Sequence, residues 1–206
     1  MYKKVLLLTM LLSLLLVSCE KEDEYEYPSV RTELACAYTA DNGCIYKIVL
    51  DDGTTYPVSL QDTRYVRNTA LRCKVVFSDE IDKIDVYSLK LVRVGQIFPS
   101  SAFEIKPMEP LEFISAWRSD DFLNFNVGFM TSSDTDDHEM AFSFDSIRYS
   151  GNSKIACMSL LHVRPAHDRE AYMEPTFLSM YLEGFQDYDS IQVNINTYDG
   201  MIKIVR

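Results

Sequence analysis

"CIYKIVLDDGTTYPV", residues 44–58, contains two runs of alternating side chains joined by an Asp-Asp-Gly turn. Alternation with a period of two places successive side chains on opposite faces of a strand. An Asp-Gly pair between two such runs indicates a tight hairpin, because glycine tolerates the backbone conformation that these turns need. The stretch therefore predicts two antiparallel strands, over residues 44–50 and 54–58.

Further strands continue this pattern on both sides of the hairpin. Residues 31–38 predict a strand that reaches the hairpin through the turn "ADNG" at 40–43, and two more strands are predicted at 71–78 and 85–97. Five strands in about 70 residues are typical of a small closed or partly open β-barrel of the OB type. The sequence therefore predicts an OB-like β-barrel over residues 29–98.

A second all-β unit is predicted beyond a proline-containing segment. Residues 99–110 contain three prolines and two serines and are interpreted as a linker. Alternation then resumes over residues 111–206, with strands predicted at 111–119, 122–131, 139–150, 154–163 and 176–185, and from 190 through a Tyr-Asp-Gly turn to the end. Six or seven strands at this spacing predict an immunoglobulin-like β-sandwich, so the whole chain is predicted to be all-β.

The N-terminal region has the layout of a secretory signal. Lys3 and Lys4 precede an apolar run from Val5 to Val17, which is shorter than the roughly 20 residues that a membrane-spanning helix needs. The run ends in Leu-Val-Ser-Cys, which resembles the bacterial lipobox, so residues 1–18 are predicted to be a lipoprotein signal peptide. Several acyl chains on Cys19 would anchor the protein to a membrane without spanning it.

An acidic tether is predicted over residues 19–28. Its sequence Glu-Lys-Glu-Asp-Glu, directly after Cys19, resembles the surface-export signal of Bacteroidetes lipoproteins. We therefore expect the protein on the outer face of the outer membrane, with the periplasmic face as the second choice.

Charge and cysteine content limit the possible partners and bonds. Removal of the signal peptide takes away two lysines and no acid, which changes the net charge from −11 to −13 and makes nucleic-acid binding improbable. Four other cysteines stand at 36, 44, 73 and 157, without zinc-binding spacing. Cys36 and Cys73 could form a disulfide if their strands are neighbours; buried, reduced thiols are the alternative.

These features together resemble one family of bacterial proteins. "PLEFISAWRSDDFLNFNVGF" at 110–129, the lipobox, the "DDGTTYPV" hairpin, the proline segment and His138 are similar to the NigD-like lipoproteins of Bacteroidetes. The resemblance covers essentially the whole mature chain and implies an OB-like barrel followed by an immunoglobulin-like sandwich. It implies an envelope role of the immunity kind and brings no catalytic residues with it.

Trp117, the only tryptophan, is a candidate residue for ligand or partner binding. Exposed tryptophans stack against sugar rings, but Phe113 and Ser115 share the strand face of Trp117 by alternation. An apolar neighbour on that face favours a core position for Trp117.

The acidic stretch at 131–139 is a weak candidate for a metal site. Asp134, Asp136 and Asp137 offer oxygen ligands for calcium, but the stretch lacks the glycine and the glutamate spacing of an EF-hand loop. A solvated hairpin tip is the preferred interpretation, and no metal or cofactor is predicted.

The three histidines, at 138, 162 and 167, do not suggest an enzyme. The chain contains no G-x-S-x-G or H-E-x-x-H motif, so each histidine is interpreted as structural or exposed. Hydrolysis would require a histidine and a carboxylate to converge in a cleft.

Residues 164–175 form the longest segment without strand character in the second unit, and we predict a loop there that contacts a partner through His167, Arg169 or Tyr172. The preferred function is a non-catalytic protein-interaction module of the cell envelope, either as a subunit of an envelope complex or as a protective protein of the immunity kind. A surface carbohydrate-binding lipoprotein is the alternative, and it predicts exposed aromatic side chains aligned on one face.

Overall fold

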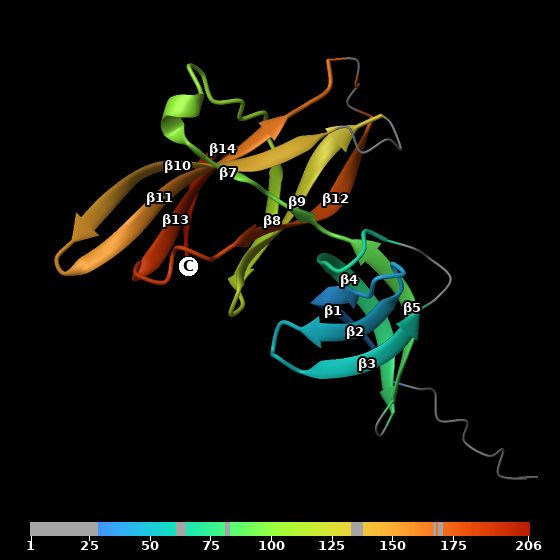
Figure 1. Ribbon diagram of the computed structural model, residues 1–206. Helices are drawn as coiled ribbons and strands as arrows, with labels where there is room; N and C mark the ends of the chain where they lie inside the picture. The colour runs from blue at the N-terminus through green and yellow to red at the C-terminus, as the bar shows by residue number, and fades with distance from the viewer. Residues whose placement is uncertain (1–28, 61–64, 81–82, 133–137, 167, 169–170) are drawn as a thin grey trace, which may run out of the picture.

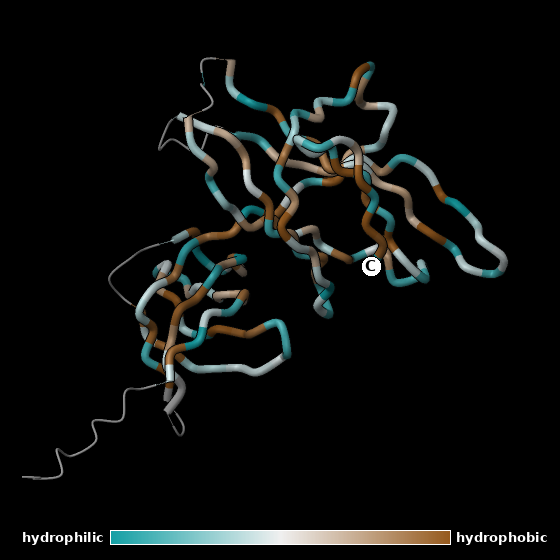
Figure 2. Tube along the Cα trace, turned by 180° about the vertical axis from the view of Figure 1, so that it is seen from behind, coloured by the Kyte–Doolittle hydropathy of each residue, from teal (hydrophilic) through white to brown (hydrophobic). Residues whose placement is uncertain are grey.

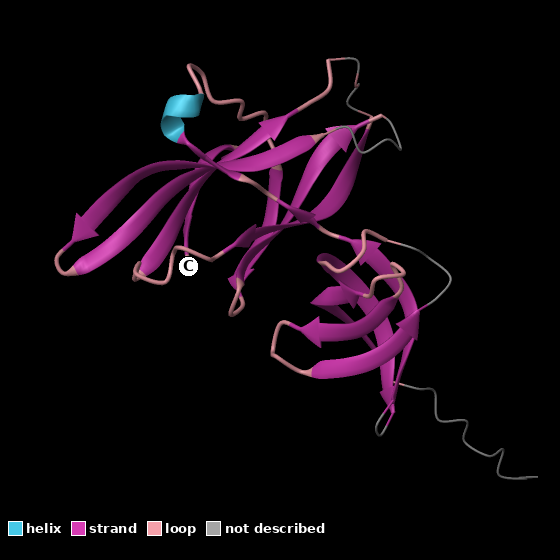
Figure 3. Cartoon of the chain, viewed as in Figure 1, coloured by secondary structure: helices cyan, strands magenta, loops and turns pink. Residues whose placement is uncertain are grey.

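The computed structural model describes residues 29–60, 65–80, 83–132, 138–166, 168 and 171–206. Strands make up nearly all of the regular structure in these ranges, and the helical element is one 3-10 turn, η1, at Ser100–Ala102 (Figure 3). No helix in the described ranges is long and apolar enough to cross a membrane. The predicted signal peptide, anchor and tether lie outside these ranges.

The first unit is one curled antiparallel sheet (Figure 1). Its strands are β1 (Val30–Thr39), β2 (Ile45–Leu50), β3 (Thr55–Leu60), β4 (Ala70–Glu80) and β5 (Lys83–Leu91). They follow the order β3-β2-β1-β4-β5, and β3 comes close to β5 at the open side. This order is that of an OB-type barrel opened between β3 and β5, as predicted.

The two predicted turns and the alternation explain this sheet. Gly43 and Gly53 have φ angles of +81° and +85°, which favour glycine, at the two tight turns. Inward-facing side chains on successive strands then form one core, which includes Ala35, Ala37, Ile45, Ile48, Cys73, Val75 and Phe77.

The second unit is a two-layered β-sandwich. One sheet has the order β14-β13-β11-β10-β7 and the other the order β6-β12-β9-β8. The strands are β6 (Arg93–Val94), β7 (Ile97–Pro99), β8 (Glu112–Arg118), β9 (Phe122–Thr131), β10 (Glu139–Ser150), β11 (Ser153–Val163), β12 (Tyr172–Tyr181), β13 (Ser190–Thr197) and β14 (Gly200–Val205). Side chains from both sheets share a core that includes Phe125, Val127, Phe142, Met158, Leu178, Met180 and Val193, and hydrophobic segments run along these strands (Figure 2).

The prediction of one strand over 85–97 is wrong. The chain leaves the first sheet at Leu91, and β6 and β7 then pair in parallel with β12 and β10 of the sandwich. The first sheet therefore ends before the predicted boundary at residue 98. Alternation continues through the change of partner, so the pattern alone does not reveal it.

The prediction that 99–110 links the two units is also wrong. This segment follows β7 and precedes β8, so it connects the two sheets of the sandwich. Lys106 Nζ lies 2.5 Å from Asp145 Oδ1, and the backbone N–H of Glu109 donates to the His162 carbonyl. Prolines and serines interrupt alternation in a crossing between sheets as they do in a linker between domains.

The predicted loop at 164–175 is strand in its last four residues. β12 begins at Tyr172 and pairs with β9 in antiparallel register, with Pro175 opposite Gly128. Pro175 cannot donate a ladder hydrogen bond. This part of β12 has β9 as its neighbour on one side, and a strand edge tolerates the missing N–H group.

Candidate interdomain binding site

The two units meet through the sheet faces that point away from their cores. On β4, Cys73 lies in the barrel core, so Arg72 and Lys74 on either side of it project toward the sandwich. On β9, Phe125 lies in the sandwich core, so Asn124 projects toward the barrel. The polar side chains of β4 and β9, which alternate with core side chains along each strand, therefore face each other.

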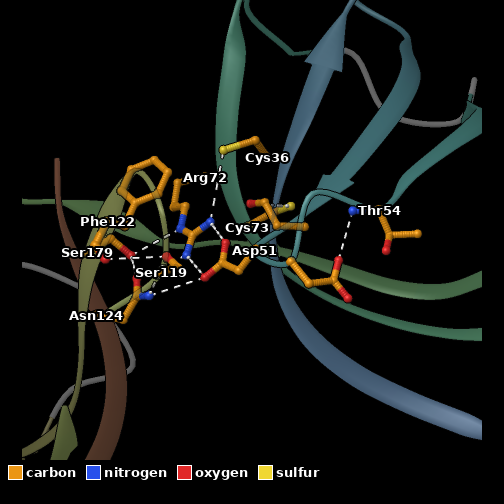
Figure 4. Close-up of polar contacts among 11 residues, drawn as sticks. Cys36, Asp51, Thr54, Arg72, Cys73, Ser119, Phe122, Asn124 and Ser179 are labelled. Atoms are coloured by element: carbon orange, nitrogen blue, oxygen red, sulfur yellow. Dashed lines mark hydrogen bonds and ion pairs between the residues drawn. The ribbon is translucent and has the colours of Figure 1, made fainter. Parts of the chain in front are cut away.

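Four polar side chains between the units form a hydrogen-bonded network that we name the Arg72 clasp: Arg72, Asp51, Asn124 and Ser179 (Figure 4). The guanidinium of Arg72 forms a two-point ion pair with Asp51, at 2.5 and 2.7 Å. It also donates to Asn124 Oδ1 at 3.0 Å and to Ser179 Oγ at 3.1 Å. Asp51 comes from the β2–β3 turn, whereas Asn124 and Ser179 come from β9 and β12, so the clasp joins the two units.

The clasp compensates a buried charge. The Arg72 side chain is 1% exposed, and its guanidinium carbon lies 4.1 Å from the centre of the Phe122 ring. Burial lowers the pKa of Arg72, but the hydrogen bonds and charge of Asp51 more than offset this effect, so the net pKa is raised. Asn124 donates in turn to Asp51 at 3.2 Å, and Ser179 donates to Asn124 at 2.7 Å. The groups that surround the charge are thus hydrogen-bonded, as a buried ion pair requires.

The cysteines do not form the disulfide that we considered. β1 and β4 are neighbours, but Cys36 lies opposite Arg72 while Cys73 lies opposite Ala35, so the two sulfurs face opposite sides of the sheet. Cys36, Cys44, Cys73 and Cys157 are all free thiols. Burial raises the pKa of Cys73 to about 12, which is the property of an inert core thiol.

A groove of about 280 Å³ lies between the units, beside the clasp. Its walls come from β4, the end of β5, β6, β9, the start of β10 and residues 174–177 of β12. Lys74, Lys90 and Arg93 line it, together with a single acid, Glu174. On a chain of net charge −11 this is a concentration of positive charge.

The floor of the groove contains an unsatisfied polar atom. Asn126 lines the groove, and its Oδ1 is buried without a hydrogen-bond partner among the described residues. A buried acceptor left in this state costs about 1–3 kcal/mol. A ligand that offers an N–H or O–H group at this point would remove that cost.

A second polar cluster lies inside the sandwich, at the ends of β9 and β11 and the start of β10. His138 Nδ1 lies 2.8 Å from His162 Nε2, and His138 Nε2 lies 2.7 Å from Asp168 Oδ2. His162 Nδ1 lies 3.2 Å from the Glu109 carbonyl, which can only accept. If His162 donates there, its Nε2 accepts a hydrogen bond from His138 Nδ1–H.

This cluster has the features of a structural element. His138 and His162 are 1% and 2% exposed, and burial lowers the pKa of His162 to about 4. Hydrogen bonds from the Ser132 backbone and from His138 lower the pKa of Asp168. The Ser132 hydroxyl donates to Asp168 Oδ1. A histidine and a carboxylate do converge here, but in a buried site.

The core interpretation of Trp117 is wrong. Its neighbour Ala116 lies in the sandwich core, whereas Trp117 is half-buried on the opposite face and packs edge-on against Phe177 at 6.3 Å. The cause is a register shift between Phe113 and Ser115, because one extra residue moves all later side chains to the other face. Trp117 therefore lies beside the interdomain seam.

The remaining predicted site residues are only partly described. Tyr172 begins β12 opposite Thr131 and is 40% exposed. No group of three or more histidine, cysteine or acidic side chains in the described ranges is arranged to hold a metal ion. The other candidates lie outside the described residues: Cys19, Asp134, Asp136, Asp137, His167 and Arg169.

Sequence reasoning did not find the clasp or the groove. Arg72 and Lys74 occupy the polar positions of an alternating strand, which normally face solvent. The asparagines at 124 and 126 in "FLNFNVGF" were the available signal, because asparagine is rare in strands.

Comparison with solved structures supports this fold. No protein-family model matches the chain, and no curated protein does. A NigD-like immunity protein from Bacteroides caccae aligns over 88% of this chain and 94% of its own length, with a TM-score of 0.67 and 21% identity. A Bacteroides vulgatus protein of unknown function aligns over 86% of this chain and 90% of its own length, with a TM-score of 0.63 and 16% identity.

A third solved structure, from Bacteroides fragilis and described as a lipoprotein, gives the same result. It aligns over 86% of this chain and 96% of its own length, with a TM-score of 0.61 and 12% identity. At these identities the likeness concerns the fold. The resemblance that the sequence indicated is thereby confirmed at the level of structure: the chain has the two-unit fold of a NigD-like protein.

Proposed function

We propose that this chain is a non-catalytic interaction protein of the bacterial cell envelope that holds a partner protein in the interdomain groove. The observation that carries the proposal is the groove itself, a basic recess with an unsatisfied buried acceptor on an acidic protein. The buried clasp beside it fixes the positions of the two units. A recess held in this way is suited to recognition, because little conformational freedom is lost on binding.

The proposal includes a location at the outer membrane, anchored through Cys19 and facing the cell surface. The lipobox, the acidic tether and a structural neighbour described as a lipoprotein support it. Replacing Cys19→Ala should move the protein from the membrane fraction to the soluble fraction. Retention of this variant in the membrane would show that the anchor is elsewhere.

A protective role of the immunity kind agrees with such a binding mode. One structural neighbour is named an immunity protein. Protection by binding requires a stable complex with one partner and no turnover. The described residues offer a groove for the former, and His138 and His162 are buried.

Site-specific crosslinking in cells tests the proposal. A photoreactive amino acid replaces Lys90, at the groove, and in a separate strain replaces Lys203, which is exposed on β14 away from it. We expect one recurrent protein to crosslink at position 90 and not at position 203. Equal patterns at the two positions would contradict a binding site in the groove.

The carbohydrate-binding alternative has less support. It requires exposed aromatic side chains on one face, but the exposed tyrosines of the described chain are spread over several elements. Tyr46 lies on β2, Tyr87 on β5 and Tyr149 on β10. Crosslinking of glycan instead of protein at position 90 would favour this alternative.

A further inference from the structure

The groove contains an open strand edge. β12 pairs with β9 along its whole length, but on its other side the described chain pairs with it only where Arg93 and Val94 lie beside Leu178 and Ser179. Upstream of this point the chain diverges from β12, because Leu91 belongs to β5 and pairs with Cys73. The groove is the space between the diverging chain and residues Glu174 to Phe177.

An open edge of this kind can accept one more strand. Extended peptides add to exposed sheet edges through main-chain hydrogen bonds, and side-chain subsites supply the specificity. Here β6 already occupies the first positions of the missing strand, in parallel orientation. An extended segment placed in the groove would continue that row along β12 through the remaining main-chain groups, since Pro175 in this edge offers a carbonyl acceptor and no N–H donor.

The charges beside this edge select for acids. Lys74 on β4 and Lys90 on β5 stand directly opposite each other in the sheet, an arrangement that is destabilising for like charges. An anion placed between them would remove this repulsion. Arg93 extends the positive wall, while its guanidinium also donates to the His138 carbonyl.

The aromatic surface in the groove is less suited to a sugar. The ring of Phe177 has the Lys74 ammonium 5.2 Å from its centre and Trp117 packed against it. A sugar ring would need an open aromatic face. The unsatisfied Asn126 Oδ1 can instead accept a hydrogen bond from an N–H group of a peptide.

We infer that the groove binds an extended, acidic peptide segment of the partner, which adds a strand beside β12 and places carboxylates against Lys74 and Lys90. This inference rests on the proposed function and specifies the chemistry of the partner. Glu174 at one end of the groove disfavours a carboxylate there, so the acids of the segment are expected toward the lysine end.

Fluorescence polarisation with the mature chain tests the inference. The probe is a labelled peptide of alternating glutamate and valine, about six residues long, which is the length of an ordinary strand. One comparison peptide has lysine in place of glutamate. A second keeps the glutamates but is N-methylated at alternate residues, so that it cannot pair as a strand. An oligomer of galacturonic acid and inorganic phosphate serve as competitors with the same kind of charge.

We expect the glutamate peptide to bind and the lysine peptide not to bind. Lys90→Glu should weaken binding at least about tenfold, Lys203→Glu less than about twofold, and rising salt should weaken it further. Equal binding of the N-methylated peptide, or equal competition by galacturonate or phosphate, would overturn strand addition. If no peptide binds while position 90 still crosslinks a protein in cells, this inference fails and the proposed function stands.

Discussion

Replacement of Arg72 tests whether the clasp joins the two units. Arg72→Ala removes the two-point ion pair, the hydrogen bonds to Asn124 and Ser179 and a longer contact with Cys36 Sγ, and it leaves Asn124 and Ser179 buried with fewer partners. Breaking a buried ion pair on one side costs about 3–5 kcal/mol. The Asp51 side chain is 21% exposed, so water can partly solvate the remaining carboxylate, and we expect the low end of this range, about 3 kcal/mol.

Urea unfolding followed by tryptophan fluorescence measures this change. Trp117 is the only tryptophan, and it contacts Phe177 at the seam between the units. A loss of about 3 kcal/mol corresponds to a fall of about 1–2 M in the urea midpoint for a chain of this size. Arg118→Ala, on the exposed side of β8, is the matched control and should stay within about 0.5 kcal/mol of the parent.

Two further variants identify the cause of the loss. Asp51→Asn keeps the shape of the side chain and removes its charge, so it should also destabilise the protein and leave Arg72 unpaired. Arg72→Lys should recover only part of the stability, because an ammonium cannot make the two-point contact. If Arg72→Ala costs no more than Arg118→Ala, the clasp does not hold the two units together.

Three other predictions follow from single buried groups. Burial lowers the pKa of His162 from 6.5 to about 4, so in this pH range the unfolded chain binds a proton that the folded state does not. The free energy of unfolding should therefore fall by roughly 3 kcal/mol as the pH drops from 6.5 to 4, and the urea midpoint of His162→Gln should depend less on pH than that of the parent. Gly95→Ala should cost about 1–3 kcal/mol in thermal or urea unfolding, since its Cβ would lie 2.6 Å from a ring carbon of the buried Phe142; an unchanged midpoint would contradict the close approach. Under native conditions a thiol reagent should modify the half-exposed Cys44 and leave Cys73 unmodified until urea unfolds the chain. Rapid labelling of Cys73 in the native state would disprove its core position.

Much of the fold was predictable because alternation is a local property. The bounds predicted for β9 and β10, 122–131 and 139–150, agree with the structure, since alternating apolar residues and flanking polar residues mark the two strands. The turns at Gly43 and Gly53 were predictable because positive φ angles select glycine. These features depend on residues that are close in the sequence.

The errors concern partners that are distant in the sequence. The register shift between Phe113 and Ser115 reverses the face of Trp117, and nothing in the residue pattern marks a bulge there. The change of sheet after Leu91 likewise leaves alternation intact while the neighbouring strand changes from β4 to β12. Alternation with a period of two indicates that a residue lies in a strand and which face of the strand carries its side chain. It does not indicate which part of the protein that face contacts.

The interdomain site could not be predicted for the same reason, because the residue pattern does not show what covers a polar strand face. Arg72, Lys74 and Asn124 occupy the polar positions of strands whose other faces are core, and such positions are solvent-exposed unless another surface covers them. Two polar faces from separate units cover each other here, so the clasp becomes buried and the adjoining lysines become the wall of a groove. Burial changes the energetic role of these residues: an exposed arginine–aspartate pair contributes little, whereas the buried one is costly to break. The seam between the units is thus where a variant at a single polar position should affect both stability and binding.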